Sequence, residues 1–278
     1  MREVLAAAMK IVRTVVRLRP RAASAHKGDF GTVLVVAGSE AMLGAAVLCA
    51  SGALRGGAGL VQVALPSALR PLLPIAVPGA TTLSRRGAEL HRAVSKATAI
   101  VAGPGLGPTA ATRSLVRAIL RASRVPIVLD ADALNVLAPL AAPPRSRGAL
   151  VITPHPGEAG RLLGSDGKRV QADRAGAAQA LCRRSGAVVV LKGAGTLVCD
   201  GTRCYTNKTG NPGMATGGSG DVLAGLLGAL LAQGLAPFEA ACLAVHTHGK
   251  AGDLVAKNLG QRGLLAQDLP LAIAQVLR

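Results

Sequence analysis

The sequence predicts an α/β fold with a doubly wound, mainly parallel sheet that carries helices on both faces. Runs of Val, Ile, Leu and Ala recur along the chain, and a helix-like segment follows each of them. These runs are continuously apolar instead of alternating, which is typical of strands buried on both faces. Half of the 278 residues are hydrophobic, but there are only two Phe, one Tyr and no Trp, so the core must be built from small aliphatic side chains.

Six strands are expected in the first two thirds of the chain, followed by a hairpin and three helices. The strands lie within residues 31–39, 59–66, 97–107, 125–138, 149–164 and 187–195, and helices are expected after each of the first five, including 41–57, 67–73 and 109–123. Residues 196–207 predict a β-hairpin with Asp200 and Gly201 at its turn. An uncharged helix over 222–238 and helices over 239–258 and 266–278 follow a glycine-rich loop. Because no linker or internal repeat divides this pattern, we expect one such domain.

The net charge of +18 suggests an anionic partner. The basic residues are mostly dispersed arginines, and no nucleic-acid recognition motif accompanies them. Sequence-tolerant binding of single strands needs exposed aromatic rings, which this chain lacks. We therefore expect an anionic small-molecule substrate and no nucleic acid.

The cysteines and apolar segments favour a cytoplasmic protein without a membrane anchor. The five cysteines form no CxxC pair and no zinc-ligand spacing, so we expect reduced, buried thiols. The N-terminal segment lacks the uninterrupted apolar region of a secretory signal, and its apolar positions between Val4 and Val16 suit an amphipathic helix or a loose tail. The run 222–238 contains Gly, Gln and Pro and is short for a bilayer span, so a buried helix is expected there.

Polar residues and glycines recur at the ends of the predicted strands. In open parallel sheets, ligands bind beyond the carboxyl ends of the strands. The residues at these ends are Gly38 and Ser39, the GPGLG segment at 103–107, Asp130 and Asp132, His155 and Glu158, and Lys192. We expect the functional site at this edge of the sheet.

The TGGSGD segment is the strongest chemical signal. Gly217, Gly218 and Gly220 can turn successive N–H groups toward one point at the positive end of a helix, which is a phosphate cradle. No GxxxxGK[ST] occurs, so this is not a Walker A loop. Asp221 would repel a phosphate, so we expect it to accept the proton of a hydroxyl that attacks phosphorus. The alternative is that Asp221 only caps its helix.

The GSGD motif resembles the anion hole and catalytic base of ribokinase-like enzymes. Together with GPGLG, LDADALN, TPHPGEAGRLLG, LKGAGT and NKTGNPGMATGG, it resembles the ADP-dependent NAD(P)H-hydrate dehydratases, from about Pro20 to the C-terminus. The resemblance implies a ribokinase-like domain over 20–278 after an extension over 1–19. It also implies that ADP drives dehydration of the S-epimer of NAD(P)H hydrate to NAD(P)H, with release of AMP and phosphate.

The resemblance also implies residue roles. Asp221 would contact the hydrated substrate and act as base, and Gly217, Gly218 and Gly220 would hold the transferred phosphate. Two further sets are implied: Lys192, Gly193, Ala194, Gly195 and Thr196 for the adenosine-phosphate site, and Ala45, Gly105 or Gly107, and His155 for the hydrated nucleotide. His155 could instead be only a turn residue at a strand end.

Cofactor and assembly are further expectations. Asp130 and Glu158 could hold Mg²⁺ through water, although no residue is assigned as a direct metal ligand. His246 and His248 form an HxH without an evident third ligand and are interpreted as structural, while Asn207 and Asn211 would order the glycine loop. The family implies a homotetramer. About 20 residues precede the resemblance, too few for the epimerase domain often fused to such enzymes, so we expect that partner on a separate chain.

Two alternatives stay open. One is a ribokinase-like kinase for a vitamin precursor of the hydroxyethylthiazole or hydroxymethylpyrimidine type, which would share GSGD but need not share the other motifs. The other is a nucleotide-binding regulator or nucleic-acid-associated protein that has kept the fold and lost the chemistry, against which the presence of Asp221 argues.

Overall fold

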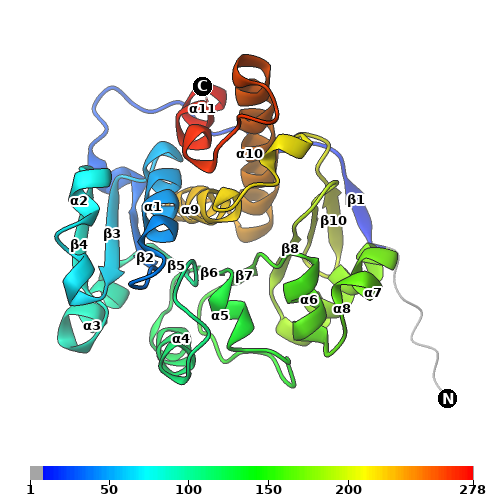
Figure 1. Ribbon diagram of the computed structural model, residues 1–278, viewed down its shortest axis with the longest axis horizontal. Coiled ribbons are helices and arrows are strands. Elements are labelled where there is room, and N and C mark those ends of the chain that lie inside the picture. Colours follow the sequence, from blue (N-terminus) through cyan, green and yellow to red (C-terminus); the bar gives the residue numbers. More distant parts are fainter. Residues whose placement is uncertain (1–8, 278) are drawn as a thin grey trace.

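The computed structural model describes residues 9–277, in which ten strands form one sheet with helices on both faces (Figure 1). The strand order is β1-β10-β9-β8-β7-β6-β5-β2-β3-β4. Neighbours are parallel except for the β8–β9 and β9–β10 pairs. The predicted mainly parallel, doubly wound sheet is therefore confirmed. The strands are β1 (Lys10–Val12), β2 (Thr32–Val36), β3 (Leu60–Leu65), β4 (Ala80–Ser84), β5 (Ala99–Ala102), β6 (Ile127–Leu129), β7 (Leu150–Ile152), β8 (Val188–Leu191), β9 (Leu197–Cys199) and β10 (Arg203–Thr206).

The helices divide between the two faces of the sheet and build two separate cores. One core includes residues of α1, α2, α9, α10 and α11, and the other includes residues of α3 to α8. The helices are α1 (Leu43–Arg55), α2 (Leu73–Ala76), α3 (Gly87–Lys96), α4 (Ala110–Ala122), α5 (Asp132–Asn135), α6 (Pro156–Leu163), α7 (Gly167–Ala172), α8 (Arg174–Ser185), α9 (Ser219–Ala232), α10 (Pro237–Leu259) and α11 (Leu269–Val276).

The continuous apolar runs have a direct structural explanation in β2. Val33 and Val35 point into the core under α9, while Leu34 and Val36 point into the opposite core. All four side chains are fully buried. Because successive side chains of a strand face opposite sides, a strand covered on both faces must be apolar at every position.

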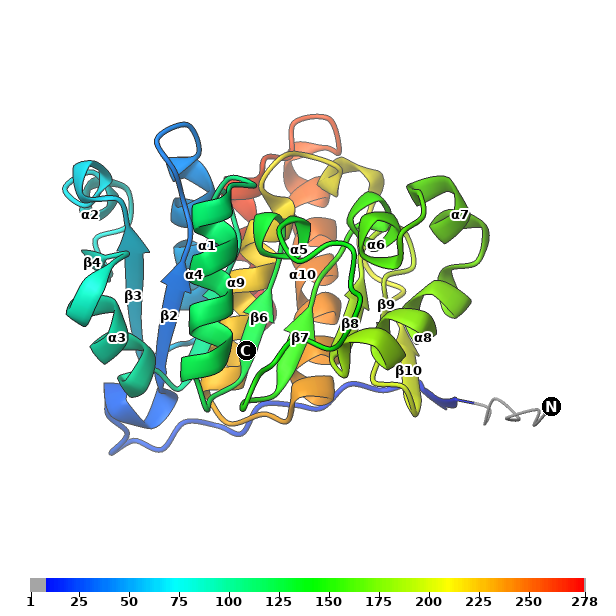
Figure 2. The ribbon, with the colours of Figure 1, turned by 90° about the horizontal axis from the view of Figure 1, so that it is seen from below.

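The order in which the chain adds strands to the sheet reverses next to β2, and this reversal fixes the position of the site. From β2 the chain runs outward to β3 and β4, and then returns to β5 on the other side of β2. Figure 2 shows β2, β3, β6 and β7 pointing to the same edge of the molecule. Loops diverge at such a reversal and leave room for a ligand beyond the carboxyl ends of the strands.

Helix α9 corresponds to the predicted uncharged helix over 222–238, but it begins earlier, at Ser219, so that it includes Asp221, and it ends at Ala232; nearly all of its residues are buried. It packs against α1 at backbone distance. A Cβ built on Gly52 would lie 2.3 Å from the carbonyl oxygen of Val222, and one on Gly225 would lie 1.9 Å from that of Cys49. The two glycines allow this approach and thereby fix where α9 begins. Among residues 9–277, no helix combines the length and apolar character that a bilayer crossing requires.

The N-terminal segment differs from the predicted amphipathic helix. Residues 10–12 form β1, which pairs in parallel with β10, and residues 13–19 contain no helix. Val12, Val15 and Leu18 pack against the core at a spacing of three residues, which suits an extended chain. The segment then runs along the amino-terminal edge of the sheet (Figure 2). The start of the predicted helix, residues 4–8, lies outside the described residues.

The sequence did not predict β4 and α3. β4 carries an exposed Thr81 and a half-buried Thr82 because it is an edge strand, so it lacks the continuous apolar run of the inner strands. The expected helix over 67–73 is a 3₁₀ turn at Ser67–Leu69 followed by α2, since Pro71 and Pro74 limit helix length there.

Candidate active site

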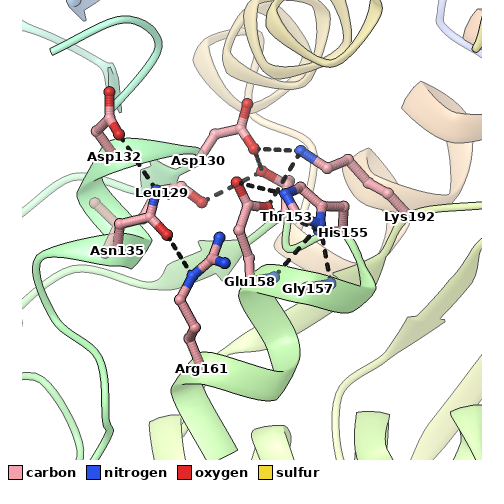
Figure 3. Close-up of polar contacts among 10 residues, drawn as sticks. All are labelled: Leu129, Asp130, Asp132, Asn135, Thr153, His155, Gly157, Glu158, Arg161 and Lys192. Carbon is pink, nitrogen blue, oxygen red and sulfur yellow. Dashed lines mark hydrogen bonds and ion pairs between the residues drawn. The ribbon is translucent and has the colours of Figure 1, made fainter. Parts of the chain in front are cut away.

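Three neighbouring strands end in one hydrogen-bonded group (Figure 3). Asp130 follows β6, Thr153 follows β7 and Lys192 follows β8. Lys192 Nζ lies 2.6 Å from Asp130 Oδ1, and the Thr153 hydroxyl donates to the same oxygen at 2.8 Å. Asp130 is 1 % exposed, so this carboxylate is stabilised by its two partners and not by water.

Glu158 and His155 form the start of α6 beside this group (Figure 3). His155 is the N-cap: its Nδ1 accepts the N–H of Gly157 at 3.0 Å, and its own N–H donates to Glu158 Oε2 at 2.8 Å. Because Nδ1 accepts, the neutral ring carries its proton on Nε2, which lies 3.4 Å from Glu158 Oε1. His155 caps α6, which agrees in part with its interpretation as a turn residue at a strand end. Its ring is nevertheless half exposed at the site.

The charges of this group determine the protonation states of Lys192 and His155. Burial lowers the pKa of Lys192, but the charges of Asp130 and Glu158 outweigh it, and the pKa lies above its usual value. Burial lowers the pKa of His155 more than Glu158 raises it, with Lys192 acting in the same direction as burial. At neutral pH the site therefore holds an ammonium at Lys192 and a neutral imidazole at His155.

The glycine loop ends next to the Lys192 ammonium. Gly218 is the N-cap of α9 with φ +91°, and none of the described side chains caps this helix. A Cβ built on Gly220 would lie 3.3 Å from Lys192 Nζ. Free N–H groups of a helix start and a lysine thus converge on one point, which suits a phosphate.

Asp221 lies on the first turn of α9, half-buried and without a capping hydrogen bond. Burial raises its pKa to about 7, the charge of Asp130 adds to this, and Lys192 opposes it. The helix-cap interpretation of Asp221 is therefore not supported. A carboxyl group that titrates near neutral pH is suited to general base catalysis.

Ala45 and the GPGLG loop lie in contact on the α1 side of the site. A Cβ built on Gly105 would lie 2.9 Å from the Cβ of Ala45, so only glycine fits there. Gly107 is fixed by its N–H, which donates to Asp132 Oδ2 at 2.8 Å. Asp132 in turn accepts from Asn135, whose amide oxygen accepts from Arg161 (Figure 3).

The segment Lys192–Thr196 forms an exposed turn after β8. Gly193 and Gly195 have φ of +129° and +64°, and the Thr196 hydroxyl donates to the Gly193 carbonyl at 2.8 Å. Ala194 is exposed between them. Arg174 supports the turn from below by donating to the carbonyls of Leu191 and Lys192.

Helix α10 holds the loop that leads to the glycine cradle. Asn207 donates to the carbonyls of Thr209 and Val245, and Asn211 donates to Asp253. Both asparagines therefore order this loop in the structure. The HxH pair is also engaged within the fold: His246 Nδ1 lies 3.4 Å from the Tyr205 hydroxyl, and His248 Nε2 lies 3.5 Å from the Ser219 hydroxyl. Burial lowers the pKa of His248 to about 4, so it is neutral.

Sequence reasoning missed Thr153, Arg174 and Asp253 as supports of the site. Each is a common residue type with a local role, and only the three-dimensional contact distinguishes it. The ion pair between Lys192 and Asp130 spans 62 positions in the chain. It could have been anticipated only from the expectation that both residues follow strands of one sheet.

Asp130 and Glu158 fit a magnesium ion that also binds substrate phosphates. Within residues 9–277 no cluster of three or more His, Cys, Asp or Glu side chains forms a metal site. Mg²⁺ usually takes only one or two carboxylates and completes its shell with water and phosphate oxygens. Asp130 Oδ2 makes no hydrogen bond to the described residues and faces Gly220, which leaves it available to such an ion.

A phosphate cradle at a helix start, a paired lysine and a buried carboxyl group, all at the carboxyl ends of a doubly wound sheet, define the ribokinase-like class. The model of the NAD(P)H-hydrate dehydratase family matches residues 33–275. The chain belongs to this family.

Relatives of known sequence agree. The chain is 44% identical over 263 residues to the ADP-dependent (S)-NAD(P)H-hydrate dehydratase of Neisseria meningitidis, covering 90% of this chain and 86% of the relative. It is 43% identical over 276 residues to the bifunctional NAD(P)H-hydrate repair enzyme Nnr of Moorella thermoacetica, covering 94% of this chain and 52% of the relative. The chain thus spans about half the length of the bifunctional relatives it matches.

Solved structures agree as well. The ADP/ATP-dependent NAD(P)H-hydrate dehydratase of Bacillus subtilis, co-crystallised with ATP and Mg²⁺, superposes with a TM-score of 0.85 at 33% identity and covers 94% of this chain and 93% of that one. A hydroxyethylthiazole kinase of Pyrococcus horikoshii has a TM-score of 0.62 at 19% identity, covering 90% and 89% of the two chains. The second likeness shows the fold alone.

Proposed function

We propose that the protein dehydrates the S-epimer of NAD(P)H hydrate to NAD(P)H at the expense of ADP. The observation that carries the proposal is the position of Asp221 beside the Gly220–Lys192 cradle, with a pKa near 7. A proton acceptor next to a phosphate cradle serves a reaction in which a substrate hydroxyl attacks phosphorus. Because the chain belongs to the NAD(P)H-hydrate dehydratase family, we infer that this hydroxyl is the one on the hydrated nicotinamide ring.

In the first step, the β-phosphoryl group of ADP is transferred to this hydroxyl. Asp221 accepts the hydroxyl proton as the new O–P bond forms and the bond to AMP breaks. The N–H groups of Gly217, Gly218 and Gly220 and the Lys192 ammonium stabilise the negative charge on the transferred group. Lys192–Thr196 hold the adenosine phosphate, and Mg²⁺, when bound through Asp130 and Glu158, supplies further charge neutralisation.

In the second step, phosphate leaves from the ring carbon. Hydroxide is a poor leaving group, whereas phosphate is a good one. The lone pair of the ring nitrogen expels it, and loss of a ring proton restores the double bond of NAD(P)H. Ala45, Gly105, Gly107 and His155 line the surface that holds the ring, and the neutral His155 can donate a hydrogen bond from Nε2 without adding a cation.

The direct test is an absorbance assay at 340 nm with purified protein, NADH hydrate and ADP. Regained absorbance with stoichiometric AMP is the expected result, with ADP preferred over ATP when both are tested at equal concentration. Phosphorylation of hydroxyethylthiazole or hydroxymethylpyrimidine without any gain at 340 nm would contradict the proposal and favour a vitamin-precursor kinase.

We further propose that the protein is a cytoplasmic homotetramer. Apolar side chains remain exposed around α10 and α11, including Leu259, Leu265 and Leu271, which are 58%, 50% and 55% exposed. Burying such a surface between subunits would stabilise an oligomer. Light scattering across the micromolar range tests this, and a monomer throughout would contradict it.

A further inference from the structure

A small cavity lies at the carboxyl ends of β3 and β4, on the same edge of the sheet as Asp221. Its volume is about 180 Å³. Leu65 and Ser84, the last residues of these two strands, lie on its wall. The other lining residues are Pro66, Ser67, Arg85 and Arg86. None of these residues takes part in the chemistry described above.

The wall of this cavity carries positive charge that no acidic group offsets. Within residues 9–277, no carboxylate lies within ion-pair distance of Arg85 or Arg86. The nearby Glu89 accepts the N–H of Ser84 at 2.8 Å and is already paired with Arg70 at 3.4 Å. Burial and the charge of Arg86 both lower the pKa of Arg85, yet a guanidinium stays protonated at neutral pH. The cavity is therefore suited to an anion.

One residue separates this cavity from the Ala45–Gly105 surface. Arg85 Nη1 donates to the carbonyl oxygen of Gly38 at 2.7 Å, and the N–H of Gly38 donates to the Pro104 carbonyl at 2.8 Å. A Cβ built on Gly38 would lie 3.1 Å from the Cβ of Ala46. The cavity and the Ala45–Gly105 surface are therefore neighbours at this edge of the sheet, joined through the buried backbone of Gly38.

We propose that the Arg85–Arg86 cavity binds the pyrophosphate of the hydrated dinucleotide. This inference rests on the proposed function. In a dinucleotide, one ribose separates the nicotinamide ring from the pyrophosphate, which matches a ring site and an anion site separated by one residue. Guanidinium groups bind phosphate oxygens with two parallel hydrogen bonds, and the hydroxyls of Ser67 and Ser84 add further donors.

Other cations at this edge are engaged elsewhere. Lys192 is paired with Asp130, Arg161 donates to Asn135, and Arg174 donates to backbone carbonyls. Arg85 donates one guanidinium N–H to the Gly38 carbonyl, and the Arg86 side chain makes no hydrogen bond to the described residues, so both keep N–H groups for an anion beside the predicted ring site.

The test compares Arg85→Gln, Arg85→Lys and Arg86→Gln with Arg92→Gln as the matched control. Arg92 is exposed on α3, so its substitution removes the same charge from the neighbouring surface without reaching the cavity. KM and kcat are measured for NADH hydrate, NADPH hydrate and ADP, and the Kd of the product NADH is measured by calorimetry. The calorimetric arm needs no turnover, so it tests the cavity even if the wild-type protein shows no dehydratase activity.

We expect Arg85→Gln to raise KM for both hydrates and the Kd of NADH about tenfold or more, and Arg86→Gln to raise them less. Arg85→Lys should recover part of the loss, while KM for ADP and kcat stay near wild type. Changes below twofold in both Gln variants, or an equal rise of KM for ADP, would overturn the proposal. An effect confined to NADPH hydrate would also overturn it and would assign the cavity to the 2′-phosphate instead.

Discussion

Lys192 and Asp130 form an ion pair of 2.6 Å across the end of β7, from the strands on either side of it. Thr153, at the end of β7 itself, completes the group. The pair places a fixed ammonium beside Gly220 and a fixed negative charge near Asp221. The ion pair between these two strand ends thus positions the ammonium of the phosphate site and helps to raise the pKa of the base.

Replacing Lys192 by Met should weaken both the fold and the site. Asp130 would remain buried with only the Thr153 hydroxyl as a described partner, and breaking a buried pair costs about 3 kcal/mol of unfolding free energy. Urea denaturation measures this loss, and the KM for ADP should rise. The double variant Asp130→Asn, Lys192→Met should recover part of the stability; no recovery would show that the pair is not the cause.

The pH dependence of kcat/KM should follow the titration of Asp221. The base must be ionised to accept a proton, so kcat/KM should rise with pH and level off above a midpoint near 7. Since the charge of Asp130 raises this pKa, Asp130→Asn should move the midpoint to lower pH, whatever its effect on the maximal rate. An unchanged midpoint in that variant would assign the titration to another group.

Two glycines of α9 should separate function from folding. Gly220→Ala places a methyl group 3.3 Å from the flexible end of Lys192, so the fold should tolerate it while KM for ADP rises at least tenfold. Gly225→Ala places a methyl group 1.9 Å from the Cys49 carbonyl, so unfolding free energy should fall by about 1–3 kcal/mol. Thermal melts and ADP titrations on both variants check this, and equal effects on both measurements would contradict it.

Deleting residues 1–19 should lower stability but keep turnover. The deletion removes β1 and the packed side chains of Val12, Val15 and Leu18, at the edge of the sheet opposite the site. We expect a lower melting temperature with kcat within about twofold of wild type. A collapse of kcat in a protein that remains folded would mean that the extension reaches the site or a subunit contact.

Much of the fold could be predicted because the inner strands leave little choice. β2, β5 and β6 are buried on both faces, and their unbroken apolar runs identify them. β4 and β1 lie at the sheet edges, where one side of the strand meets solvent and the apolar pattern is weak. The periodicity of residues 4–16 did not indicate that residues 10–12 would form a strand that pairs in parallel with β10.

The candidate site was predictable in its parts but not in its connections. Glycines at strand ends and one carboxylate after TGGSG indicate a phosphate site from residue type alone. The Lys192–Asp130 pair, the support by Thr153 and the raised pKa of Asp221 depend on the register of three strands and on burial. The periodicity of the sequence determines neither the register of these strands nor the burial of Asp221.

The variant Asp221→Asn tests the base itself, and the difference in its unfolding free energy from wild type should depend on pH. Burial raises the folded-state pKa of Asp221 to about 7, well above that of an unfolded chain. Asp221 therefore favours the folded state least once pH rises above 7, where a charged group must be buried. Asn removes this cost, so the unfolding free energy of the variant should exceed that of wild type by about 1 kcal/mol or more at pH 8. The difference should shrink toward pH 4, and a variant less stable than wild type at pH 8 would argue against the raised pKa.

The most direct measurement is turnover of Asp221→Asn at 340 nm with NADH hydrate and ADP, with ADP binding measured by calorimetry on the same preparation. The Gly217–Gly220 cradle and Lys192 are unchanged in this variant, so ADP should bind at least as well as to wild type. Asn cannot accept the hydroxyl proton, and loss of a general base lowers the rate by about 10²–10⁴-fold. A folded, ADP-binding protein with turnover reduced to that extent is the predicted result. Turnover within a few fold of wild type would contradict the assignment of Asp221 as the base and, with it, the proposed chemistry of the site.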